Sequence, residues 1–584
     1  MKKPIYILGI SESHCASAAL LKDGELIACV SEERFTRKKL QSGIPKNAIK
    51  YCFNFAKITA SDLSLVALAD FESPFLTARE STYDKFKILS ILGKPVLWLE
   101  EKIERKVPNS QELFYRIYRF FAKSNQTQRQ KRRIKKLKAT VSLPSDKFKF
   151  VQHHLCHASA ALFSSPLPSK EKEALIFTCD GVGDFESATL SKYSDDRIKK
   201  IVSINSQQSL GFFYQHITQF LGLKPIEDEY KVMGLAPYAD PKKAFHTYKL
   251  LSPYFKFSLK QNKWQILVSE HHLQGKFPKL LLNKRFDHIA YSAQRIIEEL
   301  LIRWVKKALE EFKINNLVFG GGVFANVKVN QKIASLDRVN SSFFMPSPGD
   351  ESNAIGGAFY SYFQLTGQKP KPISHLYLGP QFSEKEIKRS LKGKSKYKVE
   401  KISDINSTLA RLLAKGEVVA RFAGRMEYGA RALGNRSILA NPKNPSIVEF
   451  INSAIKNRDF WMPFAPTILR SNAKKYLKIH SSDSLFMNVS FETTKKAWED
   501  LAAALHPFDK TTRPQILDQE INPSYYDLIK KFEKLTGVGA ILNTSFNLHG
   551  EPLVASPEDA LRVFDSSKLK YLALENILIE KKDG

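Results

Sequence analysis

The sequence predicts an α/β protein with two domains, the first of which contains a duplicated α/β unit. Residues 5–33 and 174–206 each open with an apolar strand that runs into a turn of polar, glycine or small residues. A chain of 584 residues is too long for one core, because a domain usually holds about 100–200 residues. The Pro- and Lys-rich stretch 366–375 marks a boundary. We therefore predict domains at 1–365 and 370–584, with the active cleft between the halves of the first.

The elements of the first domain follow from their apolar patterns. The run YILGI near the N-terminus is too short for the apolar core of a signal peptide and predicts a buried first strand. An Asp-Gly pair between two apolar runs predicts a β-hairpin at KDGE. Residues 286–313 repeat apolar side chains with a helical period. Residues 315–333 give a strand, three glycines and a helix, and a further strand and turn bring Asp350 to the start of a helix.

The composition is that of a globular protein without a membrane span. Apolar residues make up 43% of the chain and charged residues 26%, which excludes a disordered chain. No apolar run reaches the roughly 18 residues that a membrane helix needs. The five cysteines show neither a CxxC motif nor the spacing of a disulfide framework. We therefore expect a reducing, cytoplasmic location.

The net charge of +31 is the unusual bulk property, and much of the excess lies in residues 102–149. Its densest part is QRQKRRIKKLK at 128–138. A run of this kind binds nucleic acid, an anionic membrane face or an acidic glycan, or it is a solvated insertion. We interpret 72–150 as a basic insertion in the first domain. Peripheral contact of 102–149 with an anionic membrane or glycan is the interaction we keep open, ahead of nucleic acid.

The stretch VQHHLCHASAALF at 151–163 carries candidate metal ligands. On a helix, His153 and His157 lie four residues apart and project from one face, where they can offer two nitrogen ligands to a divalent cation. Asp180 and Asp350 each follow an apolar strand. Two imidazoles and two carboxylates suit Fe²⁺, Zn²⁺ or Mn²⁺ and leave room for a phosphate oxygen. A capped helix with satisfied histidines is the alternative for this stretch taken alone.

Eight motifs resemble those of the carbamoyltransferases of nodulation-factor and antibiotic biosynthesis, and they occur in that family's order from residue 9 to residue 552. They are GISESHCASAALLKDGELIACVSEERFTRKK, HHLCHASAA, CDGVGD, YKVMGLAPYA, GGVFANVKVN, GDESNAIGGA, GRMEYGARALGNRSILANP and ILNTSFNLHGEP. The resemblance covers nearly the whole chain outside 72–150. It implies a Kae1-like N-terminal domain of the actin/Hsp70 type, which binds a metal and ATP. It also implies a YrdC-like α/β C-terminal domain, which handles carbamoyl phosphate.

The resemblance further implies roles for residues of the first domain. The metal, expected to be Fe²⁺ ahead of Zn²⁺ or Mn²⁺, would be bound by His153, His157, Asp180 and Asp350. ATP, with Mg²⁺ as its companion ion, would be bound through Gly181, Gly183, Gly320, Gly321, Gly322 and Asn326. His14 and Lys39 match residues near the transfer site, as general base on the acceptor hydroxyl and as a cation beside the adenylate phosphate. Without the resemblance, His14 is interpreted as a hairpin-end residue.

The second domain supplies arginines and amides for carbamoyl phosphate. Guanidinium groups bind phosphate bidentately and keep their charge when buried. The candidates are Arg425, Arg431, Arg436 and Arg513, of which we expect one to be structural. Asn543, Ser545 and Asn547 of NTSFN would hold the carbamoyl group. The chain departs from the family's pattern at Met462, which replaces an arginine, and at His506, which is followed by one extra residue.

These features predict an O-carbamoyltransferase. Carbamoyl phosphate and ATP would form carbamoyl adenylate in the second domain, and the first would pass its carbamoyl group to a hydroxyl of a sugar, glycan or natural product. Two alternatives stay open at this point. One is a tRNA threonylcarbamoyladenosine-type enzyme, which the basic charge favours. The other is a catalytically lapsed scaffold that binds a glycan or membrane. We also allow for a homodimer.

Overall fold

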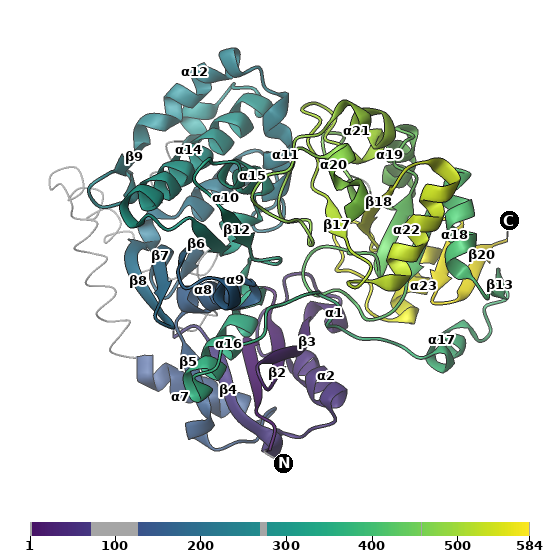
Figure 1. Cartoon of the computed structure of the whole chain (residues 1–584), viewed down its shortest axis with the longest axis horizontal. Coiled ribbons are helices and arrows are strands. Elements are labelled where there is room, and N and C mark those ends of the chain that lie inside the picture. Colours follow the sequence, from purple (N-terminus) through teal and green to yellow (C-terminus); the bar gives the residue numbers. More distant parts are fainter. Residues whose placement is uncertain (1–2, 72–125, 269–276, 457, 583–584) are drawn as a thin grey trace.

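The computed structural model describes residues 3–71, 126–268, 277–456 and 458–582 (Figure 1). Its N-terminal part contains two five-stranded sheets of the same design. The first has the order β3-β2-β1-β4-β5, with β1 (Tyr6–Ser11), β2 (Ser17–Lys22), β3 (Glu25–Ser31), β4 (Leu63–Ala69) and β5 (Phe148–Val151). The second has the order β8-β7-β6-β11-β12, with β6 (Ala174–Gly183), β7 (Glu186–Ser194), β8 (Arg197–Asn205), β11 (Asn316–Gly320) and β12 (Ser341–Phe344).

Strand directions also match between the two sheets. In each, the first three strands in sequence are antiparallel neighbours, and the last two join parallel to the first strand and to one another. This shared topology confirms the predicted duplicated actin/Hsp70-like α/β fold. The hairpin at Asp23 and Gly24 is also confirmed, because both residues have the positive φ that a tight turn between twisted strands requires.

Two helices of small residues lie between the sheets. Helix α8 (His153–Ser164) packs on the second sheet, α16 (Asn353–Thr366) packs on the first, and the two pack on each other. Their backbones approach so closely that a Cβ at Gly356 would lie 1.8 Å from the Cys156 carbonyl oxygen, and one at Gly9 would lie 1.8 Å from that of Ala354. Only glycine allows such contacts. This close packing fixes the start of each helix at the junction of the two halves.

Further helices belong to the described residues of the N-terminal part. They are α1 (Glu33–Thr36), α2 (Lys46–Ala56), α7 (Gln126–Leu137), α9 (Leu167–Lys170), α10 (Leu210–Phe220), α11 (Glu229–Leu235), α12 (Pro241–Leu251), α14 (Phe286–Phe312) and α15 (Val327–Ala334), beside a small hairpin of β9 (Phe255–Ser258) and β10 (Lys263–Ile266). The predicted long helix at 286–313 and the buried first strand are confirmed. Among the helices of the described residues, none combines the length and apolar character that a membrane crossing needs.

The predicted insertion 72–150 needs one correction. Strand β5 begins at Phe148 and pairs with β4, so residues 148–150 belong to the first sheet. The basic run extends close to these residues, so the sequence pattern alone does not separate them from the insertion. Residues 72–125 of the insertion, and 102–125 of the basic segment, lie outside the described residues. Of the run 128–138, the residues up to Leu137 lie in α7.

The C-terminal part is built on an eight-stranded sheet with the order β13-β20-β19-β14-β15-β18-β16-β17. Its strands are β13 (Tyr397–Lys401), β14 (Val419–Phe422), β15 (Arg436–Ala440), β16 (Ala465–Leu469), β17 (Gln515–Leu517), β18 (Ala540–Ser545), β19 (Tyr571–Leu574) and β20 (Ile577–Lys581). Its helices are α17 (Glu384–Leu391), α18 (Ile405–Ala414), α19 (Ser446–Ile451), α20 (Ala473–Tyr476), α21 (Lys495–Asp500), α22 (Pro523–Thr536) and α23 (Pro557–Asp565). This confirms an α/β C-terminal part.

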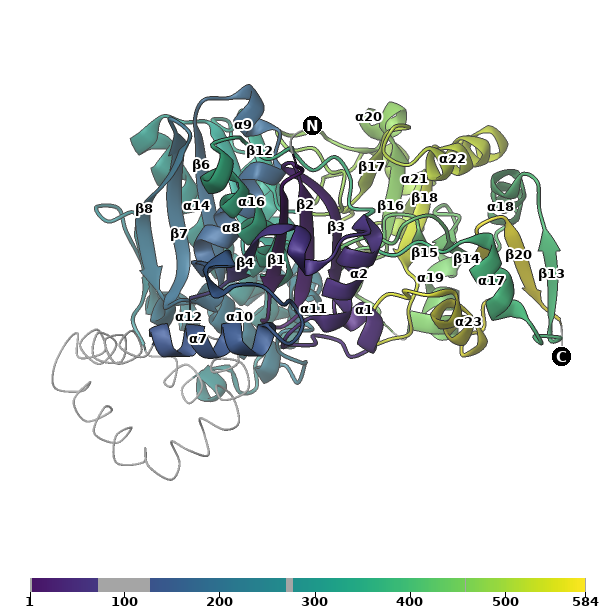
Figure 2. The ribbon, with the colours of Figure 1, turned by 90° about the horizontal axis from the view of Figure 1, so that it is seen from below.

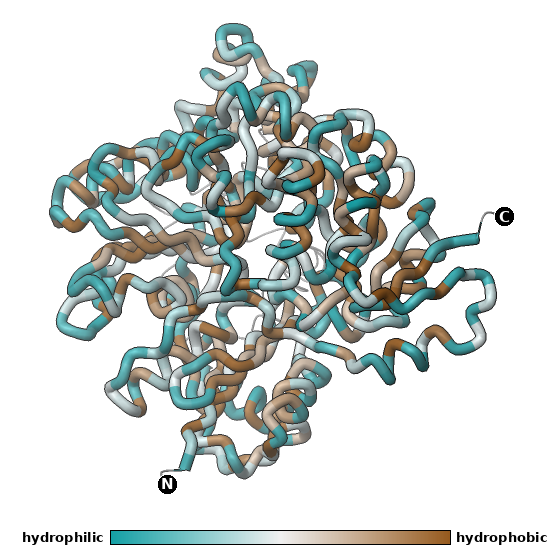
Figure 3. The backbone as a smooth tube through the Cα atoms, turned by 45° about the vertical axis from the view of Figure 1, so that its right-hand side comes forward, coloured by the Kyte–Doolittle hydropathy of each residue, from teal (hydrophilic) through white to brown (hydrophobic). Residues whose placement is uncertain are grey.

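The two parts lie side by side (Figure 2) and share apolar contacts. One buried cluster joins Met345 and Phe359 of the N-terminal part to Tyr428 and Phe486 of the C-terminal part. The apolar residues concentrate in the strands and inner helices, and the loops at the surface are mostly hydrophilic (Figure 3). Because the core continues across the junction, a rigid arrangement of the two parts follows.

Candidate metal centre and cationic site

The four predicted metal ligands lie together. His153 and His157 come from the first turns of α8, Asp180 from β6, and Asp350 from a short 3₁₀ helix just before α16. One ligand atom from each residue can be chosen so that all lie within 4.8 Å of one another. The two Nε2 atoms are 3.1 Å apart, and each lies 3.0–3.6 Å from a carboxylate oxygen of the two aspartates. Four ligand atoms at about 2.1 Å from a tetrahedral ion are about 3.4 Å from one another. The spacings in the cluster are therefore close to those of a metal site.

The donor atoms fit a divalent cation. Asp350 Oδ1 is buried and has no hydrogen-bond partner among the described residues, although burying an unpartnered carboxylate oxygen is costly. The Nε2 atoms of His153 and His157 face each other, and two N–H groups in this position would repel. A cation between the four residues satisfies all of these atoms. Imidazole and carboxylate ligands suit Fe²⁺, Zn²⁺ and Mn²⁺.

A carboxylate that the sequence analysis missed orients one ligand. Asp70 directly follows β4, and its Oδ1 accepts a hydrogen bond from His153 Nδ1–H at 2.6 Å, which turns Nε2 toward the cluster. Burial by itself lowers the pKa of His153, but the carboxylates of Asp70, Asp350 and Asp180 raise it well above its usual value. The negative field of the site therefore favours a cation. Asp70 carried the same signal as Asp180, a carboxylate at the end of an apolar strand.

The glycines predicted to bind nucleotide pack against the metal ligands. A Cβ at Gly183 would lie 2.0 Å from the His153 ring, and one at Gly320 would lie 2.7 Å from the His157 carbonyl oxygen. Gly322 donates its N–H to Asp180 Oδ1 at 3.2 Å. These contacts explain why side chains are missing here. A contact with nucleotide through the backbone of these residues stays a prediction.

The other predicted nucleotide residues are placed differently. Gly321 has a φ of 95° and lies against the Cys179 backbone. Asn326 caps α15 by accepting from Val329 N–H at 3.2 Å, and its amide pairs with that of Gln294. Its polar atoms therefore already have protein partners.

Gly183→Ala is expected to weaken metal binding by at least about tenfold, because the added methyl group displaces the His153 ring. Titration of the protein with Mn²⁺ measures the effect. Gly181→Ala is the matched control, because its Cβ would meet only the Phe212 ring at 3.4 Å. Equal affinities in the two variants would contradict the steric role of Gly183.

The two predicted catalytic residues lie at different distances from the cluster. His14 Nδ1 is 3.3 Å from Asp350 Oδ2, and its side chain is 36% exposed, so it borders the metal centre on one side and solvent on the other. Ser13 Oγ donates to the same Asp350 oxygen. Lys39 pairs instead with Glu227 at 2.8 Å. The structure therefore brings His14, but not Lys39, into direct contact with a metal ligand.

Three arginines form a cationic cluster in the C-terminal part. Burial and the neighbouring guanidinium groups of Arg431 and Arg458 lower the pKa of Arg513 well below its usual value. Burial lowers the pKa of Arg431 and that of Arg458 from their usual values, the charge of Arg458 lowers the pKa of Arg431 further, and Tyr230 of α11 lies near both. Within the described parts of the chain none of the three forms an ion pair with a carboxylate. Positive charge without a counter-ion is the arrangement of an anion site. Arg458 was missed because the notable arginine-rich motif lies earlier in the chain.

A buried lysine, which the sequence analysis also missed, lies beside this cluster. Lys456 Nζ donates to Ser545 Oγ at 3.0 Å and to Asn547 Oδ1 at 2.7 Å. Burial and the charge of Arg458 lower the pKa of Lys456 well below its usual value. Asn543 Nδ2–H donates to Ala432 O at 3.1 Å. The predicted residues of NTSFN thus line the same region as the cationic cluster.

Two predicted phosphate ligands, Arg425 and Arg436, donate hydrogen bonds to backbone carbonyls. Arg425 donates from Nη2 to the carbonyl oxygens of Leu378 at 2.6 Å and Ile27 at 2.9 Å, and its guanidinium lies 4.1 Å from the Phe55 ring centroid. Arg436 is fully buried and donates to four carbonyl oxygens, those of Ala423, Pro380, Gly424 and Asn435. These backbone contacts occupy both guanidinium groups, so the structure offers no support for a phosphate-binding role of either residue. Guanidinium groups satisfy backbone carbonyls as well as phosphates, and the sequence does not distinguish the two uses.

Arg425→Ala is expected to lower the free energy of unfolding by about 2 kcal/mol, because carbonyl groups lose a charged donor. The KM for carbamoyl phosphate should stay unchanged. Chemical denaturation and steady-state kinetics measure the two effects. A large rise in KM with unchanged stability would contradict the structural role.

Both parts of the chain match one family along most of their length. Residues 6–359 match the family described as Carbamoyltransferase N-terminus, and residues 410–581 match Carbamoyltransferase C-terminus. The chain belongs to the carbamoyltransferase family. It is therefore an enzyme that transfers carbamoyl groups, and the resemblance predicted from its motifs is confirmed.

Relatives of this carbamoyltransferase cover nearly all of its length. An uncharacterized protein of Synechocystis sp. is 32% identical over 99% of this chain and 97% of its own. Nodulation protein NolNO of Sinorhizobium fredii is 30% identical over 97% of this chain and 79% of its own. Among solved structures, HypF of T. kodakarensis aligns with a TM-score of 0.32 at 13% identity, over 63% of this chain and 49% of HypF.

Helix α11 lies near both charged sites of the carbamoyltransferase, because its Glu229 lies near His14, which borders the metal centre. Just before it, Glu227 pairs with Lys39, and within it Tyr230 lies near the arginine cluster. Lys231 pairs with Asp459 at 3.2 Å. Met462 and His506, the two positions that depart from the family pattern, both lie against Gly234 near the end of this helix. His506 Nε2–H donates to the Gly234 carbonyl at 2.9 Å, and the Met462 sulfur lies 3.0 Å from a Cβ placed on Gly234.

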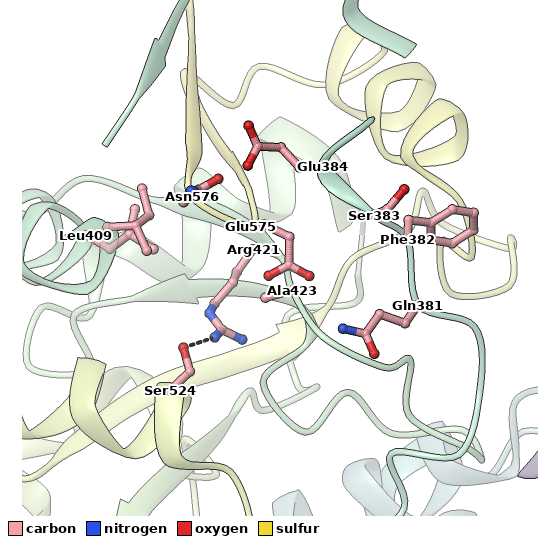
Figure 4. Close-up of a pocket in the computed structure, with 11 residues that line it drawn as sticks. Gln381, Phe382, Ser383, Glu384, Leu409, Arg421, Ala423, Ser524, Glu575 and Asn576 are labelled. Carbon is pink, nitrogen blue, oxygen red and sulfur yellow. Dashed lines mark hydrogen bonds between the residues drawn. The ribbon is translucent and has the colours of Figure 1, made fainter. Parts of the chain in front are cut away.

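A separate cavity of about 470 Å³ lies in the C-terminal part (Figure 4). Glu384, Glu575 and Ser524 are among the residues that line it. Its one arginine, Arg421, donates to Ser524 Oγ at 3.0 Å and to the Gly434 carbonyl at 2.6 Å. None of the residues predicted for catalysis or binding lines this cavity, and its carboxylates disfavour an acyl phosphate.

Proposed function

We propose that the protein is an O-carbamoyltransferase that uses carbamoyl phosphate and ATP, by way of carbamoyl adenylate, to carbamoylate a hydroxyl of a sugar, glycan or natural product. One observation carries the proposal. The chain holds two sites of opposite charge, an anionic His₂Asp₂ cluster and a cationic arginine cluster, and helix α11 lies near both, with Glu229 near His14 at the anionic site and Tyr230 near Arg431 and Arg458. A cationic site suits the binding of an anionic acyl phosphate, and a metal site suits transfer from a leaving phosphate.

The cationic cluster suits the activation step. Arg431, Arg458 and Arg513 would bind carbamoyl phosphate, and Ser545 beside Lys456 would hold the carbamoyl group through hydrogen bonds. Hydrolysis of carbamoyl phosphate gives carbamate and phosphate. An oxygen of the carbamate then attacks the α-phosphate of ATP, so that pyrophosphate leaves and carbamoyl adenylate forms.

The His₂Asp₂ cluster suits the transfer step. A divalent metal bound by His153, His157, Asp180 and Asp350, which we propose to be Fe²⁺, would supply Lewis-acid stabilisation of negative charge on phosphate and carbonyl oxygens. His14 would accept the proton of the acceptor hydroxyl as that oxygen attacks the carbamoyl carbon. The acceptor gains the carbamoyl group and AMP leaves. Lys39 would move from Glu227 to the adenylate phosphate.

The intermediate of these two steps has to be protected from water. Carbamoyl adenylate is a reactive anhydride, and water has to be excluded while it moves between sites. Tyr230 of α11 lies near the cationic cluster, and the same segment contacts Lys39 through Glu227. We propose that this segment borders the path of the intermediate, with the nucleotide contacting the backbone at 320–322.

Pyrophosphate release from ATP tests the proposal. Release is measured with carbamoyl phosphate as second substrate and, separately, with threonine plus bicarbonate. We expect release with carbamoyl phosphate only. Release only with threonine and bicarbonate would assign the protein to tRNA modification, and absence of release with either would favour a lapsed scaffold.

A further inference from the structure

Helix α7, within the basic run, carries one arginine that points into the protein. Arg133 is 6% exposed, whereas its neighbours Arg132, Lys131 and Lys135 are exposed to solvent. We infer that Arg133 is a positioning residue for the metal centre. It lies outside the eight family motifs, in the segment interpreted as an insertion. The inference rests on the proposed metal centre. It states that helix α7, through Arg133, helps to hold the metal ligands in position.

The guanidinium of Arg133 bridges two loops. Its Nη1 donates to the carbonyl oxygen of Asp70 at 2.6 Å, and its Nη2 donates to that of Ala69 at 2.9 Å. Its Nε donates to Glu12 Oε2 at 2.7 Å, and the Glu12 side chain is 4% exposed. The Arg133 guanidinium thus donates to three buried acceptors from two segments. Hydrogen bonds with a charged donor in a buried site are strong and geometrically specific.

Both loops lead directly to metal ligands. Asp70 holds the Nδ1–H of His153 at 2.6 Å, and Ser13, the residue after Glu12, donates to Asp350. One guanidinium therefore supports the orientation of a ligand on each side of the cluster. Partners of this kind fix ligand geometry and change metal affinity when they are removed.

The backbone of Asp70 needs this support. Its φ is 69°, in the left-handed region, which aspartate tolerates better than most non-glycine residues but which its neighbours still have to hold in place. The Asp70 N–H donates to Val151 O at 2.9 Å, and the carbonyl on its other side accepts from Arg133. Without the arginine, the Asp70 carbonyl would be buried without its charged donor, and the loop would relax toward a more favourable conformation. The Asp70 carboxylate would then leave His153.

Metal affinity tests the inference in the full-length protein. Mn²⁺ is the probe, and the free ion is measured by its electron paramagnetic resonance signal. Arg133→Gln is expected to raise the dissociation constant about tenfold, and Arg133→Lys, which keeps the charge and loses the bridge, should raise it less. Arg132→Gln makes the same chemical change at the exposed neighbouring position and should leave the affinity unchanged. Glu12→Gln, which preserves size, should weaken binding in the same direction.

The Mn²⁺ affinities of these variants either support or overturn the role of Arg133. Equal Mn²⁺ affinity of Arg133→Gln and Arg132→Gln overturns the inference. If Arg133→Gln fails to fold, as shown by loss of its melting transition, Arg133→Lys and Glu12→Gln provide the test, and wild-type affinity in both overturns it. Wild-type protein that binds Mn²⁺ no better than His153→Ala overturns the proposed metal centre and this inference with it. That result differs from a failure of the inference alone, in which wild-type protein binds and the Arg133 variants bind equally well.

Discussion

His153→Ala is expected to abolish carbamoyl transfer to an acceptor while pyrophosphate release from ATP and carbamoyl phosphate continues near the wild-type rate. His153 offers Nε2 to the metal cluster and is held there by Asp70. Loss of a residue that supports a metal ligand typically lowers metal affinity or activity roughly 10- to 100-fold. Loss of the ligand itself should lower the transfer activity by more than that. The arginine cluster is formed by other segments, so adenylate formation should persist. Assays of pyrophosphate and of carbamoylated product in the same reaction measure both steps.

His154→Ala is the matched control for this variant. It removes the neighbouring imidazole of the same helix, which contacts Thr178 Oγ1 at 2.8 Å and is not among the four ligands. Transfer should continue in this control. Loss of pyrophosphate release in His153→Ala, with release retained in His154→Ala, would contradict the separation of the two steps.

Arg458→Gln is expected to have the opposite effect. Pyrophosphate release should fall by at least about a hundredfold, since the anion loses a charged donor of a preorganised site. Mn²⁺ affinity should stay at the wild-type value, because the metal ligands come from the N-terminal part. Release kinetics at several concentrations of carbamoyl phosphate and a metal titration give the two values.

Arg470→Gln provides the control for charge alone. Arg470 is an exposed arginine of the same part, paired with Asp518 at 2.7 Å and Asp483 at 2.8 Å. Its substitution should leave release unchanged. If Arg458→Gln retains wild-type kinetics, or if both variants lose release equally, the cationic cluster is not the site of activation.

The sequence predicts those residues whose signal is local. His153 and His157 share a helix face by spacing, and Asp180 follows an apolar strand, so their meeting depended only on the expected fold. The repeated strand and turn pattern predicted the duplication for the same reason. Residues that act through a distant partner could not be found this way. Arg133 lies 121 residues from Glu12 in the chain, and only the folded structure brings them into contact.

Arginine roles show a second limit of the sequence. Arg431 and Arg436 lie five residues apart in one motif, yet one joins a cationic cluster and the other is buried against backbone carbonyls. Both uses require the same donors, so only the position of the acceptors separates them. Lys456 is missed similarly, because a single lysine carries no pattern, and its partners Ser545 and Asn547 come from a distant strand and loop.

Anomalous X-ray diffraction from crystals of Mn²⁺-loaded protein, at the metal's absorption edge, tests the metal centre most directly. We predict one strong peak bounded by His153 Nε2, His157 Nε2 and the carboxylates of Asp180 and Asp350, with each ligand atom roughly 2.0–2.3 Å from the ion. A peak at another site, or a map without a peak between these four residues, would contradict the account.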